Sequence, residues 1–168
     1  MITYRTATSA DAVALATLGA DSFAQTFGHL YDPADLALFL ANHNEDNWAA
    51  DLADPAIAVR VAEEDGALIG YAKLGPPHLP FTPPDNAAEL RALYVLRPWH
   101  GAGVAAALID WIIVAARREG ARELYLSVFI DNPRARRFYK RYGFDEIGPY
   151  TFMVGTHADE DVVMRLLL

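Results

Sequence analysis

Two glycines near the middle of the chain lie where an apolar run gives way to an alanine-rich segment. Residues 89–96 read as a strand, Gly101 and Gly103 follow it, and residues 104–106 open a helix. Glycine permits positive φ values and lets a ligand approach the backbone closely. A helix N-terminus adds free N–H groups and a partial positive charge. This arrangement of strand, glycine loop and helix predicts a binding site for a phosphate or pyrophosphate.

A second cluster, at residues 131–144, contains a tyrosine that could transfer a proton. Asn132 precedes Pro133, which is typical of a helix N-terminus, and Gly143 is suited to the C-terminus. Tyr139 lies inside that helix, and its neutral phenol can donate a proton at neutral pH. The same residues also fit an ordinary helix, in which Tyr139 lies beside a buried stripe of Ala135, Phe138 and Tyr142.

The glycine loop has other interpretations. Gly101, Gly103 and Ala106 fit the spacing of a dinucleotide-binding fingerprint, which also needs an acid at the carboxyl end of the next strand. Glu123 lies at the right distance, but it begins its strand and would point away from the ligand. No Lys-Ser/Thr pair follows the second glycine, which excludes a Walker loop. A helix that merely begins with glycines is the plain structural alternative.

The elements around these motifs predict one mixed α/β domain over residues 1–168. Period-two alternation and turn residues indicate strands at 2–6, 58–62, 67–74, 89–96, 123–129, 148–154 and 161–167. Helices are expected after Thr8, which has the capping-box spacing with Asp11, and near 36–40, 46–52, 101–119 and 133–142. The first helix is expected to bury Val13, Leu15, Leu18, Phe23 and Phe27. A loop over 75–86 with five prolines can be neither a helix nor a central strand.

Composition excludes several classes of function. The chain has no cysteine, which rules out disulfides, thiolate metal sites and a covalent acyl-thioenzyme, and no metal is expected. The formal net charge of −8 argues against a nucleic-acid partner. It is compatible with a cationic substrate, although an acidic surface also serves solubility. No signal peptide or membrane-spanning run is visible, so a cytoplasmic protein without membrane contact is expected.

Both motifs resemble those of the GNAT superfamily of acyl-CoA N-acyltransferases. Motif A of that family has Arg or Gln, two residues, Gly, one residue, then Gly or Ala. His100, Gly103 and Ala105 hold these positions, and His100 departs from the pattern. Motif B has Asn, an Ala three residues on, Phe-Tyr and Gly-Phe, all of which occur within residues 132–144. The resemblance implies a mostly antiparallel sheet with a splayed parallel strand pair and helices on both faces.

The resemblance also implies acetyl-CoA as the cosubstrate, direct attack by an amine in a ternary complex, and roles for individual residues. The pantetheine arm inserts between the splayed strands, where the backbone of Leu93–Val95 polarises the thioester carbonyl. Tyr139 protonates the leaving thiolate, and Glu89 is the candidate general base, with a solvated strand end as its plain alternative. Coenzyme contacts are expected from Leu93, Tyr94, Val95, His100, Gly101, Ala102, Gly103, Val104, Ala105, Ala106, Asn132, Ala135 and Tyr139.

The whole chain is similar to the polyamine-acetylating branch of the family, sometimes called PaiA-type. This similarity rests on residues 23–27, Tyr31, Pro33, 148–155, Asp161 and Met164. It implies a small-molecule amine as the acceptor, bound through cation–π contacts by aromatic residues that equally fit a helix core: Phe23, Phe27 and Tyr31. A protein N-terminus or lysine as acceptor, a non-catalytic acetyl-CoA-binding regulator, and a homodimeric assembly are left open.

Overall fold

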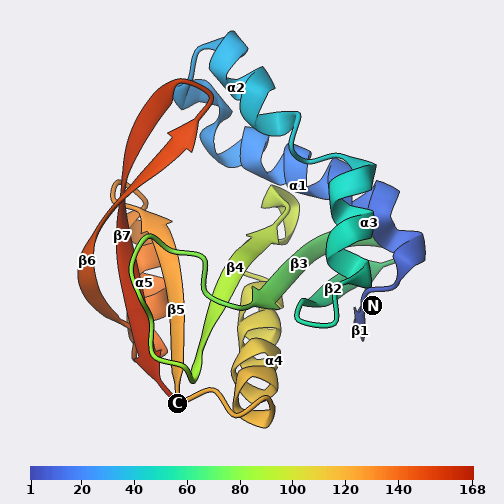
Figure 1. The fold of residues 1–168 in the computed structure, drawn as a ribbon. Helices are drawn as coiled ribbons and strands as arrows, with labels where there is room; N and C mark the ends of the chain where they lie inside the picture. Colours follow the sequence, from blue (N-terminus) through green and yellow to red (C-terminus); the bar gives the residue numbers. More distant parts are fainter.

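The computed structural model describes residues 1–168, whose strands form one sheet in the order β1-β2-β3-β4-β5-β7-β6 with helices on both faces (Figure 1). The strands are β1 (Ile2–Thr6), β2 (Ala58–Glu64), β3 (Ala67–Gly75), β4 (Ala87–Val95), β5 (Glu123–Phe129), β6 (Asp145–Val154) and β7 (His157–Leu167). The α-helices are α1 (Ala12–Phe27), α2 (Pro33–Leu40), α3 (Glu45–Ala53), α4 (Val104–Arg118) and α5 (Pro133–Arg141). No helix combines the length and the apolar character needed to cross a bilayer.

The central strands β4 and β5 are the only parallel pair, and they separate after a short contact. Three residue pairs join them, ending at Glu89 opposite Tyr125, and beyond this point the strands diverge (Figure 1). The chain passes from β4 to β5 through α4, because parallel strands need a long crossover connection. On its other edge β4 stays paired with β3 as far as Val95. One edge of β4 and one edge of β5 are therefore unpaired over their carboxyl halves.

The two faces of the sheet have separate cores. Helix α4 packs its buried stripe of Leu108, Ile109 and Ile112 against one face, and α5 contributes Tyr139 to the same cluster. Helices α1 and α3 cover the other face, where Leu15 and Trp48 lie with Tyr71. Successive residues of a strand point to opposite faces. The sheet therefore holds two distinct environments on either side of the β4–β5 divergence.

The predicted fold class is confirmed, and most differences concern where elements begin. The helix expected from residue 101 begins at Val104, because Gly103 adopts a left-handed conformation with φ 82°. Strand β4 begins at Ala87, so Glu89 lies inside the strand and not at its start. Strand β6 begins at Asp145 and contains Pro149, which is tolerated because β6 is an edge strand. Val13, expected in the buried stripe of α1, is 58% exposed.

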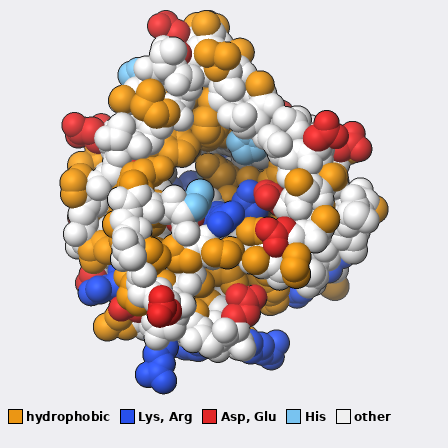
Figure 2. All heavy atoms as spheres, in the orientation of Figure 1, with side chains coloured by type: hydrophobic (Ala, Val, Ile, Leu, Met, Phe, Trp, Pro, Cys, Tyr) orange, Lys and Arg blue, Asp and Glu red, His pale blue; other side chains and the backbone are white.

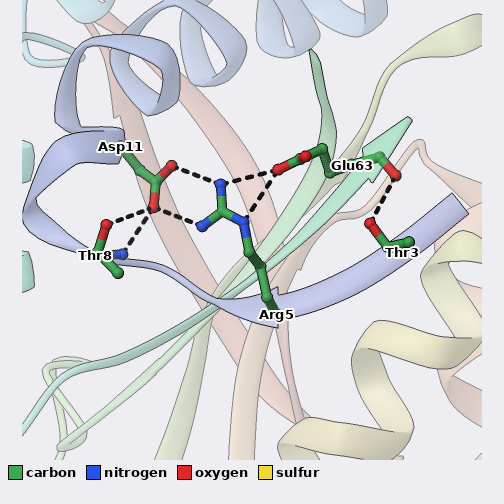
Figure 3. A network of polar contacts seen from close by, with 5 residues as sticks. All are labelled: Thr3, Arg5, Thr8, Asp11 and Glu63. Carbon is green, nitrogen blue, oxygen red and sulfur yellow. Dashed lines mark hydrogen bonds and ion pairs between the residues drawn. The ribbon is translucent and has the colours of Figure 1, made fainter. Parts of the chain in front are cut away.

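A polar network ties the first strand to the start of α1 (Figure 3). Arg5 on β1 donates two hydrogen bonds of 2.8 Å to the two carboxylate oxygens of Asp11 and one of 3.0 Å to Glu63 on β2. Asp11 also accepts the backbone N–H of Thr8 at 2.7 Å, which completes the capping box expected from the sequence. The network thus links β1 and β2 to the start of α1.

We expect Asp11→Ala to lower the free energy of unfolding by about 1–2 kcal/mol, the typical effect of losing a helix-capping side chain. Hydrogen bonding to Arg5 lowers the pKa of Asp11 to about 2, below its ordinary value of 3.8. A carboxyl whose pKa is depressed by folding stabilises the protein above its unfolded pKa and loses that effect as pH falls. Melting curves of both proteins should therefore differ at pH 7 and converge as pH falls from 4 towards 2. The exposed Asp21→Ala is the control, and an equal loss there would contradict the assignment.

Candidate active site

A cavity of about 580 Å³ lies between the diverging halves of β4 and β5. Figure 2 shows this face of the molecule hollowed near its middle, with hydrophobic atoms around much of the opening. Residues of α4 and α5 line the cavity from one face of the sheet, and residues of α1, β6 and β7 line it from the other. Because no backbone hydrogen bonds join β4 and β5 here, the cavity passes through the sheet. We call its two parts the donor end, on the α4–α5 side, and the acceptor end, on the α1–β7 side.

The glycine loop forms one wall of the donor end. Gly101 and Gly103 have φ values of 83° and 82°, and a Cβ added to either would meet no atom within 4 Å. Both glycines therefore open onto free space in a conformation that other residues adopt only under strain. The first helical hydrogen bond of α4 runs from the Ala107 N–H to the Gly103 carbonyl at 3.0 Å. The amides of residues 104–106 precede it and have no helical partner, so they are free to bind an anion.

His100 stands where Arg or Gln was expected, and both of its ring nitrogens contact other residues of the protein. Its Nε2 lies 2.7 Å from the carbonyl oxygen of Val95, and its Nδ1 lies 2.7 Å from Nη1 of Arg134. A guanidinium only donates, so Nδ1 is the acceptor and Nε2 carries the proton that is donated to Val95. The ring thus links β4 to α5. It holds Arg134 at the donor end, where that side chain lines the cavity.

Three arginines of α5 line the donor end: Arg134, Arg137 and Arg141. The spacing of three and four residues places them on one side of the helix, beside the glycine loop. Together with the N-terminus of α4 they make this end electropositive in a protein of net charge −8. These arginines were not among the residues predicted from the sequence, although their helical spacing is visible there.

Tyr139 and Asn132 of the second motif also reach the cavity. Asn132 caps α5 by accepting the N–H of Ala135 at 3.2 Å, so its carbonyl oxygen serves the helix. Tyr139 is the buried residue of α5, and the expected stripe of Ala135, Phe138 and Tyr142 is only half buried. Burial raises the pKa of Tyr139 well above its ordinary value, so the phenol stays protonated at neutral pH. A protonated phenol at the cavity wall is a proton donor by geometry and by charge state.

Strand β4 presents its unpaired edge to the cavity along Leu93, Tyr94 and Val95. Their peptide groups are available on that edge because β5 has moved away. An extended ligand can add to such an edge as a further strand would, through main-chain hydrogen bonds. The structure therefore offers the backbone surface that the resemblance assigns to the pantetheine arm.

Glu89, the predicted base, lies outside the cavity lining. It is 2% exposed, at the last paired position before the strands diverge, and its Oε2 is 2.5 Å from Nδ1 of His78 and 3.9 Å from Nε of Arg91. His78 belongs to the proline-rich loop, whose residues do not line the cavity either. Burial raises the pKa of Glu89 to about 7. The alternative of a solvated strand end is wrong, because the side chain is enclosed between the sheet and this loop.

The acceptor end is aromatic and acidic. The predicted residues Phe23, Phe27 and Tyr31 all line it, joined by Phe129 of β5 and Phe152 of β6. Two carboxylates also line it, Asp159 and Asp161, which lie two residues apart on β7 and therefore on the same face. Asp161 was predicted only as part of a family resemblance, and Asp159 was not predicted.

Of the predicted site residues, only Ala102 and Glu89 are absent from the cavity wall. Ala102 donates its amide to the carbonyl of Trp99 at 3.2 Å, so this peptide group closes the loop and does not face a ligand. The cavity therefore gathers segments 93–106, 132–139 and 23–31 at one place. The donor end fits coenzyme A. The open glycines and the free amides of α4 can bind its pyrophosphate, and the arginines of α5 can neutralise the charge of its phosphates. The unpaired edge of β4 can bind its pantetheine arm. When bound there, acetyl-CoA supplies the thioester-activated acetyl group.

These features define a class of protein, the acyltransferases in which two parallel strands diverge around a cavity with a phosphate loop at one end. The sequence matches the acetyltransferase (GNAT) family over residues 20–144, and the chain belongs to that family. A protein of Mycobacterium tuberculosis described as an uncharacterized N-acetyltransferase is 37% identical over 155 residues, which cover 92% of this chain and 96% of that protein. The chain is accordingly an acetyl-CoA-dependent N-acetyltransferase.

Two further proteins are similar to the chain. The aminoalkylphosphonate N-acetyltransferase of Salmonella typhimurium is 33% identical over 103 residues, which cover 60% of this chain and 65% of that protein. The crystal structure of PaiA N-acetyltransferase from Thermoplasma acidophilum in complex with coenzyme A has a TM-score of 0.81 at 18% identity, covering 100% of this chain and 99% of that one. This second likeness shows a common fold.

Proposed function

We propose that the enzyme acetylates a cationic primary amine of the polyamine type, which binds at the acceptor end and attacks the acetyl thioester in a ternary complex. The observation that carries the proposal is the pair of carboxylates, Asp159 and Asp161, set among aromatic side chains at the acceptor end. Carboxylates and aromatic faces both attract a protonated amine. The arginines lie at the donor end, so the charge of the cavity favours an anionic donor on one side and a cationic acceptor on the other.

The contacts between β6 and α2 beside the acceptor end favour an acceptor that is narrow. The turn after β6 docks on α2, where Thr156 donates its N–H and its hydroxyl to Asp35, both at 2.7 Å. Phe39 of α2 packs on Phe152 of β6 at 5.5 Å between ring centroids. These contacts close one side of the acceptor end, which favours an aliphatic amine over a folded protein. An aminoalkylphosphonate, the substrate class in the name of the Salmonella relative, would bring an anion to two carboxylates.

Different groups of the chain bind the acceptor, orient the thioester and donate the proton. The acids and aromatic rings of the acceptor end hold the ammonium group, and the unpaired edge of β4 orients the thioester. Tyr139 donates a proton to the departing thiolate, because its phenol is protonated and at the cavity wall. Direct attack needs no acyl-enzyme, and the absence of cysteine from the sequence is consistent with that.

The test is release of free thiol from acetyl-CoA with matched amines. We expect 1,4-diaminobutane, spermidine and spermine to be acetylated, with kcat/KM for the diamine about tenfold above that for butylamine. One additional ion pair in a desolvated site corresponds to roughly that factor, about 1.4 kcal/mol. Asp159→Asn should reduce the difference between diamine and butylamine more than it reduces turnover of butylamine. Equal kcat/KM for the two amines, or a preference for an aminoalkylphosphonate or a peptide N-terminus, would contradict the proposal.

A further inference from the structure

We propose that Asp161 is the catalytic base, whose carboxylate removes the proton from the ammonium group of the bound acceptor. The inference rests on the proposed amine acceptor and gives Asp161 the step that the family resemblance assigns to Glu89. A protonated amine has no lone pair with which to attack a carbonyl, so the site must contain a group that accepts this proton. The structure distinguishes three buried carboxylates near the β4–β5 divergence by what each of them contacts.

Asp161 is buried, lines the cavity and has no partner. Its residue is 7% exposed, its side chain belongs to the cavity wall, and neither a hydrogen bond nor an ion pair satisfies its carboxylate. A carboxylate of low exposure without a protein partner is unfavourable, and native structures usually satisfy such groups. A cationic ligand in the cavity would supply the missing partner. The position of Asp161 on β7, beside β5, places it on the acceptor side of the divergence.

The other two carboxylates differ from Asp161 in their contacts or in their position. Asp159 accepts a hydrogen bond from the hydroxyl of Tyr31, and its Oδ1 lies 3.2 Å from Nε2 of His157. Glu89 Oε2 contacts His78, and although Oε1 has no partner, the side chain lies outside the cavity lining. Asp159 is therefore held by protein partners beside the acceptor, and Asp161 is free to take up a proton.

The surroundings of Asp161 give its carboxyl group a pKa that suits a base. Burial, with a smaller contribution from the neighbouring Asp159, raises the pKa of Asp161 from its ordinary 3.8 to about 7. The other titratable groups near Asp161 are phenols, whose pKa values are raised by burial and also by its carboxylate: Tyr31 before α2, Tyr94 on β4 and Tyr150 on β6. A base with a pKa near the working pH combines a useful deprotonated fraction with proton affinity. Since a raised carboxyl pKa leaves Asp161 protonated in acid, its activity as a base must rise with pH through neutrality.

The proton balance closes with groups on the cavity wall. The acceptor binds as R–NH3⁺, and one proton passes to Asp161, which leaves R–NH2. The amine then attacks, the C–N bond forms and the C–S bond breaks. Tyr139 gives its phenolic proton to the thiolate and regains the second proton that the nitrogen loses. The products are the amide and the free thiol, and the proton on Asp161 returns to solvent.

The experiment compares pH profiles of kcat/KM for wild type and Asp161→Asn with the best amine of the panel. Wild type should rise through about pH 7 and then level off until the amine itself deprotonates near pH 10. Asp161→Asn can use only amine that is already neutral, so its log kcat/KM should rise with unit slope from pH 6 to about 10. At pH 7 its kcat should be lower by about 10²-fold, with unchanged affinity for coenzyme A. Asp161→Glu should recover part of the activity.

Glu160→Gln is the matched control, because Glu160 lies on the same strand, points to the opposite face and is exposed. A melting curve and coenzyme titration of each variant separate loss of the base from loss of the fold. If wild type acetylates the amine and Asp161→Asn keeps the levelled profile, the base assignment is overturned and the proposed function stands. Transfer of the unit-slope profile to Glu89→Gln would assign the role to Glu89. If wild type acetylates no amine, the proposed function itself is overturned.

Discussion

Gly103→Glu is expected to abolish binding of coenzyme A and acetyl-CoA to this enzyme. Gly103 stands at the N-terminus of α4 with φ 82°, and a side chain there would extend into open space at the donor end. The new carboxylate would occupy the position suited to phosphate, beside the free amides of α4 and the arginines of α5. Repulsion of the coenzyme's anions then adds to the backbone strain of a non-glycine residue. Isothermal titration calorimetry of the variant should show no heat of binding.

The matched control for this prediction is Gly103→Ala. Alanine carries the same backbone strain, of about 1–2 kcal/mol, without adding a charge. We expect it to weaken coenzyme binding moderately and to leave the fold intact by circular dichroism. Micromolar binding retained by Gly103→Glu would show that the glycine loop does not hold the phosphates. The arginines of α5 would then be the candidate phosphate ligands.

Tyr139→Phe is expected to lower kcat by about 10²-fold or more, the usual effect of losing a proton-transfer group. The phenylalanine ring can keep the edge-on packing of Tyr139 against Phe138 and Phe144, whose centroids lie 5.3 and 5.6 Å away. The hydroxyl makes no hydrogen bond within the protein, so its loss leaves no buried group unsatisfied. The affinity for coenzyme A should therefore change little. Steady-state kinetics and calorimetry together measure both quantities.

Tyr142→Phe is the control on the same helix. Its hydroxyl lies 3.5 Å from the carbonyl oxygen of Ala106 and outside the cavity lining, so turnover should stay close to that of wild type. If Tyr139→Phe keeps wild-type turnover, Tyr139 has only a packing role, and the thiolate takes its proton from solvent.

Most residues that line the donor end could be selected from the sequence because that end is built from local motifs. Strand, glycine loop and helix follow one another within residues 87–118, and Asn132, Tyr139 and Gly143 mark a second continuous segment. These residues function mainly through their backbone conformation. Glycine, proline and helix-capping residues indicate that conformation in the sequence. Ala102 shows the limit, since only the structure reveals that its amide is used by Trp99.

The acceptor end was harder to predict because it depends on strand order. Asp159 and Asp161 lie about 130 residues from Tyr31 in the chain and meet it only because β7 lies between β5 and β6. The position of Glu89 at the start of its strand was also wrong, because β4 begins two residues earlier at Ala87. Period-two spacing of the two aspartates predicts a common face of β7, but no local pattern predicts that this face borders the cavity.

The two ends of the cavity are formed by different segments of the chain. The donor wall comes from residues 93–106 and 132–141, whereas the acceptor wall comes mainly from residues 23–31 and 152–161, near the two extremities of the chain. Substitutions in the outer segments can therefore alter which amine is accepted without disturbing how the acetyl donor is held. Selection can act on the two specificities almost independently. A scaffold divided in this way is a favourable starting point for directed evolution towards new amines, with libraries confined to the outer segments.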